Sequence, residues 1–429
     1  MDADYRGLAV VRSLGRRGIP VCVLERGDHR LAALSRYTCR TVGWSARHSE
    51  EEKLKFLIHL ADDRGIRNWM LFPTGDEDAA FVSRHHQTLR QYFELTTAPW
   101  EVLQRAYNKK LAHQLADEVG VGRPWTIYPS NRAEVEACAC QFPVILKPAY
   151  NSGFNRFTAS KAWRVDTREQ LLALYDEAKT LVDSSNLMIQ ELIPGGGESQ
   201  FSYTALTREG RPLASLTARR TRQFPMDFGR ASTFVETIED SASAAAGIRL
   251  LGALKYTGIA EVEFKRDPRD GKLKLLDINP RVWGWHSLCG SAGVDYPYLL
   301  WLLTIGEPIP PTKARVGTRW VRMSTDLPTA IREVLAGRLP LRAYLRTLRA
   351  PLASAIYASD DPLPGILEIP LLVYLAGKRI LRRFWDRFSE GGNFLWRAAQ
   401  GHGIHSSTPV DVRKRPKPDY GRNVKGDLC

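Results

Sequence analysis

The segment over 260–281, AEVEFKRDPRDGKLKLLDINPR, constrains the fold more than any other part of the chain. Two runs with alternating apolar and polar residues, 259–265 and 272–278, flank an Asp-Pro-Arg-Asp-Gly turn, which predicts a β-hairpin. Because side chains alternate along a strand, one face of this hairpin is apolar and is expected to pack on the core. The residues expected on that buried face are Val262, Phe264, Leu276 and Ile278.

The opposite face of the hairpin carries acids and an amide. Glu261 and Glu263 lie on the first strand, and Asp277 and Asn279 lie on the second, so all four are expected to point to one side. Magnesium ions that bridge phosphates prefer carboxylate and amide oxygens, which makes Glu263, Asp277 and Asn279 candidate metal ligands. Arg281 follows at the same alternation and could hold a phosphate or a carboxylate. A solvated hairpin face explains the acids alone, but it explains the string Asp-Ile-Asn-Pro-Arg poorly.

Two lysines that precede the hairpin stand at positions suited to a phosphate. Lys147 ends the apolar run VILK, directly before Pro148, and Lys109 begins an amphipathic stretch that stops at Gly120. A lysine at the end of a buried strand, beside a turn, is well placed to contact a phosphate. Each of these lysines taken alone would more often be a surface residue.

Two further groups of side chains are weaker candidates. The stretch 218–237 is basic, is expected to be a loop, and could bind a γ-phosphate or a substrate carboxylate through its arginines. Trp283, Trp285 and His286 either line an acceptor pocket, with His286 as a base, or pack in the core. The arginines of the basic stretch are Arg219, Arg220, Arg222 and Arg230.

The chain divides into three expected parts. Residues 1–105 alternate helix and strand signals, with strands over 20–24 and 68–73, which predicts a parallel sheet. The strand that should precede the first helix is missing. Residues 106–305 contain the hairpin and the lysines. Residues 306–429 begin with a proline-rich linker and continue as basic helical segments and a polar tail.

In chain order, Lys109, GVGRPWT, VILKP, IQELIPGGGE, AEVEF and LLDINPR resemble the motifs of the ATP-grasp superfamily. The closer resemblance is to its carboxylate–amine ligases, which include D-aspartate ligase-like enzymes, and it covers Tyr5 to Ile305. It implies an α/β and α+β fold, in which ATP lies between the two α+β lobes of an ATP-grasp domain. A Rossmann-like parallel-sheet domain, truncated at its first strand, would precede this domain, and a helical extension would follow it.

The resemblance also implies roles for single residues. Magnesium, or manganese in its place, would be bound by Glu263, Asp277 and Asn279, while Arg281 and Lys147 would be catalytic. Backbone groups of Glu191 and Ile193 would read the adenine edge, and Glu198 would bind the ribose. The sequence departs from many relatives after Lys147, where AYNSGFNRFTASK replaces a glycine-rich loop. The full set implied to bind ATP is Lys109, Lys147, Lys161, Glu191, Ile193, Glu198 and Arg220.

We therefore expect an ATP-dependent ligase that activates a carboxylate as an acyl phosphate for attack by an amine, with release of ADP and phosphate. The expected partners are small-molecule carboxylate and amine substrates, and a homodimer is left open. One alternative keeps the fold but acts on bicarbonate, as a carboxylase or a carbamoyl-phosphate-like lobe. The other is a non-catalytic nucleotide-binding or scaffold protein.

The chain carries 61 Lys and Arg against 47 Asp and Glu, a formal net charge of +14, which favours an anionic partner. No nucleic-acid-binding motif accompanies this charge, so nucleic acid is not expected. The N-terminus lacks the pattern of a signal peptide, and a cytoplasmic location is expected.

The region near 341–388 leaves open a peripheral contact with an anionic membrane. Leu341, Leu345, Leu348 and Leu352 are spaced to share one helix face, beside a parallel series of arginines. Basic residues next to apolar ones suit a helix that lies in a membrane interface. The alternative is that these helices pack on the core and turn their arginines to water.

Overall fold

The computed structural model describes residues 1–27, 30–45, 48–150, 155–226, 229, 231–349 and 351–378. The chain forms two compact units, Met1–Ile366 and Leu367–Cys429, and the elements labelled α1 to α14 and β1 to β15 below belong to the first. The division into parts 1–105, 106–305 and 306–429 remains a proposal. The sequence expectations for 151–154, Arg230 and 379–388 lie outside the described residues.

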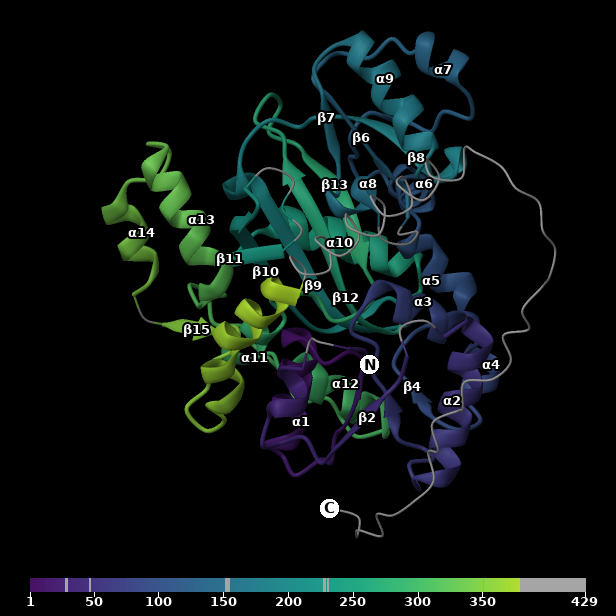
Figure 1. Ribbon diagram of the computed structural model, residues 1–429, viewed down its shortest axis with the longest axis vertical. Coiled ribbons are helices and arrows are strands. Elements are labelled where there is room, and N and C mark those ends of the chain that lie inside the picture. The colour runs from purple at the N-terminus through teal and green to yellow at the C-terminus, as the bar shows by residue number, and fades with distance from the viewer. Residues whose placement is uncertain are drawn as a thin grey trace, which may run out of the picture. The chain divides into compact units, whose positions relative to one another are not determined.

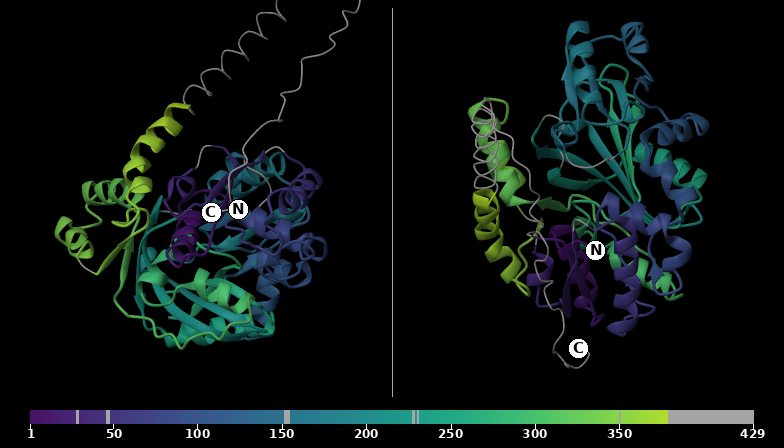
Figure 2. Two further views of the ribbon diagram at one scale, coloured as in Figure 1. Left: turned by 90° about the horizontal axis from the view of Figure 1, so that it is seen from below. Right: turned by 45° about the vertical axis from the view of Figure 1, so that its right-hand side comes forward.

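The N-terminal part consists of helices and parallel strands, as predicted, but the two predicted strands lie in two separate two-stranded pairs and not in one sheet. Strand β1 (Cys22–Glu25) pairs with β2 (Arg40–Gly43), and β3 (Met70–Leu71) pairs with β4 (Glu94–Leu95), both in parallel. Apolar side chains of these strands pack with those of neighbouring helices in one core. The helices are α1 (Tyr5–Gly15), α2 (Glu50–Asp63), α3 (Asp76–Arg84), α4 (His86–Leu89) and α5 (Trp100–Tyr107), drawn in purple to blue in Figures 1 and 2.

The first residues of the chain connect these two strand pairs. The ammonium group of Met1 donates to the carbonyl of Phe72 at 2.6 Å, and the amide of Asp2 donates to the carbonyl of Leu24 at 3.0 Å. The hydroxyl of Thr74 donates to the Met1 carbonyl at 2.6 Å. The extended N-terminal residues thus occupy the position between β1 and β3.

A four-stranded antiparallel sheet, in the order β5-β8-β6-β7, forms the smaller lobe. Its central strands, β6 (Val144–Pro148) and β8 (Leu187–Glu191), are buried along most of their length because Leu171 and Tyr175 of one helix pack in the same core. That helix is α9 (Arg168–Lys179), and the remaining elements of this lobe are β5 (Thr126–Ile127), α7 (Arg132–Glu136), α8 (Arg156–Ala159) and β7 (Trp163–Val165).

A seven-stranded sheet, in the order β13-β12-β9-β10-β11-β14-β15, forms the larger lobe, shown in teal and green in Figure 1. Leu115 and Leu250 from two helices, α6 (Lys109–Glu118) and α10 (Ser241–Ala253), share a core with strands of this sheet. The strands are β9 (Gln200–Arg208), β10 (Arg211–Phe224), β11 (Ala231–Ile238), β12 (Gly258–Arg266), β13 (Leu273–Asn279), β14 (Arg319–Val321) and β15 (Leu352–Ser354). The later helices are α11 (Ser287–Ser291), α12 (Tyr296–Thr304), α13 (Met323–Leu335) and α14 (Leu341–Thr347).

The prediction of a loop over 218–237 is wrong for most of that stretch, which forms the ends of two paired strands, β10 and β11. Its charges are accommodated because the strands supply partners. Arg219 pairs with Glu236 on the neighbouring strand, and Arg222 pairs with Asp326 of α13 at 2.8 Å. Paired guanidinium groups can remain in a sheet that is otherwise buried.

The prediction of one helical face from Leu341 to Leu352 is also wrong. Helix α14 ends at Thr347, and Leu352 lies on β15, which pairs in parallel with β14. Pro351 lies between the two elements, and a proline cannot continue a helix as an interior residue without losing a hydrogen bond. A helix over 363–378 follows, and none of the helices in the described parts of the chain is long and apolar enough to cross a membrane.

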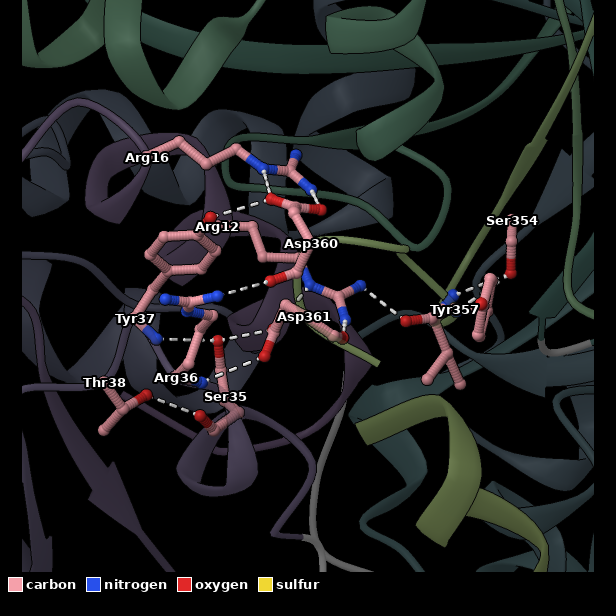
Figure 3. A network of polar contacts seen from close by, with 12 residues as sticks. Arg12, Arg16, Ser35, Arg36, Tyr37, Thr38, Ser354, Tyr357, Asp360 and Asp361 are labelled. Atoms are coloured by element: carbon pink, nitrogen blue, oxygen red, sulfur yellow. Dashed lines mark hydrogen bonds and ion pairs between the residues drawn. The ribbon is translucent and has the colours of Figure 1, made fainter. Parts of the chain in front are cut away.

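Two adjacent aspartates attach the segment after β15 to the N-terminal part (Figure 3). Asp361 accepts from Arg12 Nε at 2.9 Å, from the Ser35 hydroxyl at 2.7 Å and from the Arg36 amide at 2.9 Å. Asp360 accepts two hydrogen bonds from Arg16, each 2.7 Å long, in a more exposed position. Residues at opposite ends of the first unit are therefore joined through α1.

Candidate active site

A cavity of about 1000 Å³ is lined by residues of both lobes and of the N-terminal part. The smaller lobe contributes β6 and the turn after β8, and the larger lobe contributes β10, β12 and β13. Of the residues implied to bind ATP or magnesium or to be catalytic, Glu198 alone is absent from the walls of this cavity. The predicted residues on the walls are Lys109, Lys147, Lys161, Glu191, Ile193, Arg220, Glu263, Asp277, Asn279 and Arg281.

The acidic face of the β12–β13 hairpin is present as predicted. Glu261 lies opposite Asn279 and Glu263 lies opposite Asp277 in the antiparallel register. Since residues two apart on a strand share a face, these four side chains line the same wall. The alternation in the sequence was sufficient to identify this wall.

The prediction that Leu276 lies in the core is wrong. The register shifts between Glu263 and Phe264, so that Phe264 pairs with Leu275 instead of Leu276. A β-bulge of this kind inserts one residue and reverses the alternation beyond it. Leu275 is consequently fully buried, whereas Leu276 lines the cavity.

Hydrogen bonds hold the acids and the amide together. The Asn279 amide nitrogen donates to Glu261 at 3.0 Å and to Glu263 at 2.8 Å. Glu261 also accepts from the Ser202 hydroxyl at 2.8 Å and from the Trp285 indole at 3.0 Å. Glu261 was recognised as an acid on this face but was not assigned a role, and it has the most enclosed position of the set.

Two cations balance the acids from either side. Arg220 forms an ion pair with Glu263, and Lys109 Nζ lies 3.0 Å from Asp277. Burial by itself raises the pKa of Glu263, but the Arg220 and Lys161 charges and the hydrogen bonds from Arg220 and Asn279 together outweigh burial and lower the pKa to about 2. Burial and the neighbouring Glu263 raise the pKa of Glu261 to about 7. The cavity wall thus keeps one carboxylate charged beside another that is readily protonated.

The donor set fits a hard divalent cation only in part. Among the described residues, no three His, Cys, Asp or Glu side chains form a group that could hold a metal ion by themselves. Glu263, Asp277 and the Asn279 oxygen supply oxygen donors on one wall, and phosphate or water oxygens would have to complete the shell. That incomplete protein shell is the usual form of a magnesium site that acts on phosphates.

The catalytic candidates Lys147 and Arg281 both lie on the cavity wall. Lys147 is the last buried residue of β6, and burial together with Lys109 lowers its pKa to about 7. Arg281 Nε donates to Asp76 at 2.5 Å, and its Nη2 donates to the Asn279 oxygen at 3.2 Å. Arg281 therefore joins the acidic wall to the start of α3.

The turn after β8 forms one end of the cavity. The Glu191 carboxylate is bonded within the protein. It accepts a hydrogen bond from the Trp125 amide at 2.9 Å and forms ion pairs with Lys274 and Arg269, each at 2.6 Å. The Glu191 amide is also used within the protein, because it donates to the Trp125 carbonyl at 2.9 Å.

Two further residues were expected near this end. The Ile193 carbonyl accepts from Lys265 Nζ at 2.8 Å. Glu198 lies in a short 3-10 turn, where its carboxylate accepts from the Gly196 amide at 2.8 Å. Ile193 lies on the cavity wall, whereas Glu198 lies beside it.

The other aromatic and basic candidates separate into two groups. Arg220 faces the cavity, whereas Arg219 and Arg222 are paired elsewhere. Trp283 and Trp285 are buried and also line the cavity, but His286 does not. Burial lowers the pKa of His286 to about 4, and its Nδ1 donates to the Trp283 carbonyl at 2.7 Å.

Sequence reasoning missed the contribution of the N-terminal part to this cavity. Tyr5, Arg6, Asp76 and Tyr107 line it beside Arg281. The acidic run Asp76-Glu77-Asp78 begins α3. No local pattern connects these residues with the hairpin, because the contacts are entirely tertiary.

No family model matches the chain. Over 242 residues the chain is 24% identical to D-aspartate ligase of Enterococcus faecium (strain Aus0004), a match that covers 53% of this chain and 57% of that protein. The chain therefore spans about half the length of this curated relative.

Solved structures show the same fold at low sequence identity. Biotin carboxylase from Campylobacter jejuni, solved as a β,γ-ATP complex, has a TM-score of 0.59 and 16% identity, covering 74% of this chain and 73% of that chain. L-amino acid ligase from Bacillus licheniformis has a TM-score of 0.56 and 13% identity, covering 71% and 73%. The chain therefore has the fold of the ATP-grasp enzymes, as the sequence predicted, and is similar to the carboxylate–amine ligases among them.

Proposed function

We propose that the chain is an ATP-dependent ligase that joins a carboxylate to an amine. The observation that carries this proposal is the cavity wall on which Glu263, Asp277 and Asn279 meet Lys109 and Arg281. Phosphoryl transfer needs positioning and charge neutralisation more than a protein nucleophile, and this wall supplies both signs of charge. The names of two similar proteins, D-aspartate ligase and L-amino acid ligase, support the same class of reaction.

The proposed reaction has two steps. A carboxylate oxygen of the first substrate attacks the γ-phosphorus of ATP, the bond from that phosphorus to the β,γ-bridging oxygen breaks, and ADP leaves. The uncharged amine of the second substrate then attacks the acyl carbon, inorganic phosphate leaves, and the nitrogen releases a proton. The product is an amide, and one ATP is consumed for each bond formed.

In this proposal Lys109 and Lys147 hold the phosphates, and Arg281 stabilises the charge of the transferred group. Glu263, Asp277 and Asn279 would hold Mg²⁺, or Mn²⁺ in its place, which would neutralise phosphate charge when bound. Arg220 and Lys109 neutralise these acids before the nucleotide binds, so phosphates and metal would have to rearrange both contacts.

The nucleotide base is proposed to lie at the turn after β8. Backbone groups of Glu191 and Ile193 would contact the adenine, and Leu276 would pack against the ring from the hairpin side. Glu198 is proposed to contact the ribose, and Lys161 to reach the phosphates from the smaller lobe.

The experiment that tests the proposal measures ADP release from the full chain with MgATP and a panel of D- and L-amino acids. Hydroxylamine is added as a small nucleophile that converts an acyl phosphate into a coloured hydroxamate. Hydroxamate formation that depends on ATP and on a carboxylate supports the ligase. ATP binding without turnover on any carboxylate would instead favour the scaffold alternative.

A peripheral membrane contact is proposed for α13 and α14. Four apolar residues of α13 at spacings of four, Met323, Leu327, Ile331 and Leu335, are exposed on one stripe. Exposed arginines accompany them at Arg332, Arg342 and Arg346, and such a combination suits an anionic membrane surface. Flotation with anionic liposomes at low and high salt tests this contact. Protein that stays in the soluble fraction at low salt would refute it, and sedimentation velocity would then show whether a second copy covers the stripe.

A further inference from the structure

A second cavity, of about 420 Å³, lies in the N-terminal part beside the proposed active site. Cavities of this size accommodate small ligands. Its walls come from α2, α3, α5 and the start of α6. The side chains with polar or aromatic character on these walls include Glu50, Lys53, Glu77, Arg84, Trp100 and Tyr107.

The two cavities are neighbours. Tyr107 and Tyr150 line both of them, so the two cavities adjoin at these residues. At the start of α3, Asp76 lines the main cavity, where it accepts from Arg281, and the next residue, Glu77, lines the second cavity. A ligand in the second cavity would therefore lie close to the Arg281 end of the main one.

The charges in the second cavity suit a zwitterion. Glu50 is neutralised by an ion pair with Arg84, and His85 Nε2 lies 3.3 Å from the same carboxylate. Within the described residues, neither Glu77 nor Lys53 forms an ion pair, so one carboxylate and one ammonium group remain for a ligand.

The position of the two unpaired groups gives the zwitterion a direction. Glu77 adjoins Asp76 on the side of the main cavity, whereas Lys53 lies on α2, whose residues line only the second cavity. A ligand held by both would turn its ammonium group toward Arg281 and its carboxylate away from it. Trp100, whose ring lies 5.9 Å from that of Tyr107, supplies an apolar surface for the ligand's side chain.

We infer that this second cavity binds the amine substrate, and that this substrate is an α-amino acid. Its ammonium group is held by Glu77 and its carboxylate by Lys53. The inference rests on the proposed ligase function, because it assigns the second cavity to the nucleophile that attacks the acyl phosphate. The orientation places the nitrogen on the side where that intermediate would form.

The test uses the full chain, MgATP and the panel of D- and L-amino acids, with ligation and hydroxamate formation measured separately. Glu77→Gln and Lys53→Met should each raise the KM for the amino-acid nucleophile about tenfold or more, since each removes a charge-assisted contact. The KM for ATP and the rate of hydroxamate formation should not change, because hydroxylamine needs no such pocket. Glu51→Gln and Lys55→Met, which remove charges of the same two kinds from residues of α2 that are absent from the cavity walls, are the controls.

The outcomes separate the two proposals. Without hydroxamate formation in the wild-type protein, the ligase proposal fails. Two other results would overturn the assignment of the second cavity but leave the ligase proposal intact. In the first, hydroxamate forms but no amino acid serves as nucleophile. In the second, Glu77→Gln and Lys53→Met have the same KM for the amino acid as the controls.

Discussion

Asp277→Asn provides the clearest test of the proposed metal site. It replaces a charged oxygen ligand by a neutral one of equal size, and the structure predicts that the fold tolerates the change. The Asp277 and Lys109 side chains are 20% and 19% exposed, so loss of their ion pair should cost no more than about 1 kcal/mol of unfolding free energy. Mutation of a residue that only hydrogen-bonds to a metal ligand lowers activity about 10–100-fold. Loss of a ligand itself should therefore lower the rate of ATP turnover by at least about 100-fold.

Glu263→Gln is a less informative variant, although it removes another proposed ligand. Arg220 and Glu263 have side chains that are only 5% and 12% exposed. Removing one charge of a buried pair leaves the other uncompensated, at a cost of about 3–5 kcal/mol. Loss of activity in this variant would therefore reflect instability as well as loss of a ligand.

The assay for Asp277→Asn is ADP release at increasing magnesium concentration, with thermal unfolding measured in parallel. Asp270→Asn is the control, since Asp270 lies in the turn of the same hairpin and is exposed. Wild-type turnover with unchanged magnesium dependence in Asp277→Asn would refute the metal assignment. A large loss of thermal stability would refute the reasoning about the ion pair.

Three further predictions follow from burial and charge. The pKa of Lys147 is lowered to about 7, so its amine is mostly uncharged at about pH 8.5, and binding of the MgATP phosphates should protonate it with uptake of roughly one proton. Calorimetry in buffers of different ionisation enthalpy measures this uptake, which Lys147→Met should abolish. Asp361→Asn should cost about 3–5 kcal/mol in urea unfolding, because its carboxylate is 1% exposed and paired with Arg12. Asp360→Asn, in an exposed pair with Arg16, should cost less than about 1 kcal/mol, and equal losses would contradict this explanation. His286→Asn should lower the melting temperature but leave kcat unchanged, since His286 lies outside the cavity walls. A large fall in kcat at unchanged stability would instead indicate that His286 acts as a base.

The acidic wall could be predicted because the information that defines it is local. Strand alternation and a Pro-Arg-Asp-Gly turn determine which side chains of a hairpin share a face. The same rule failed where the register shifts. One bulge moves Leu276 from the expected core to the cavity, and shifts between Arg219 and Gln223 on β10 direct Arg220 and Arg222 to different partners. A bulge depends on how a strand meets its neighbour, and the sequence of one strand does not reveal it.

The part of the cavity nearest Arg281 illustrates a second limit. From the sequence, Arg281 is expected to hold a phosphate or a carboxylate, because it follows Asn279 at the right spacing. In the structure its guanidinium is bonded to Asp76, a residue of the N-terminal part. Arg281 can contact a substrate with its whole guanidinium group only if its bond to Asp76 breaks. The N-terminal part therefore contributes directly to the proposed chemistry. The proposed nucleotide end of the site is built from short motifs that are visible in the sequence. Tyr5, Asp76 and Tyr107 line the same cavity but are brought to it only by the tertiary fold, so no sequence motif could have revealed them.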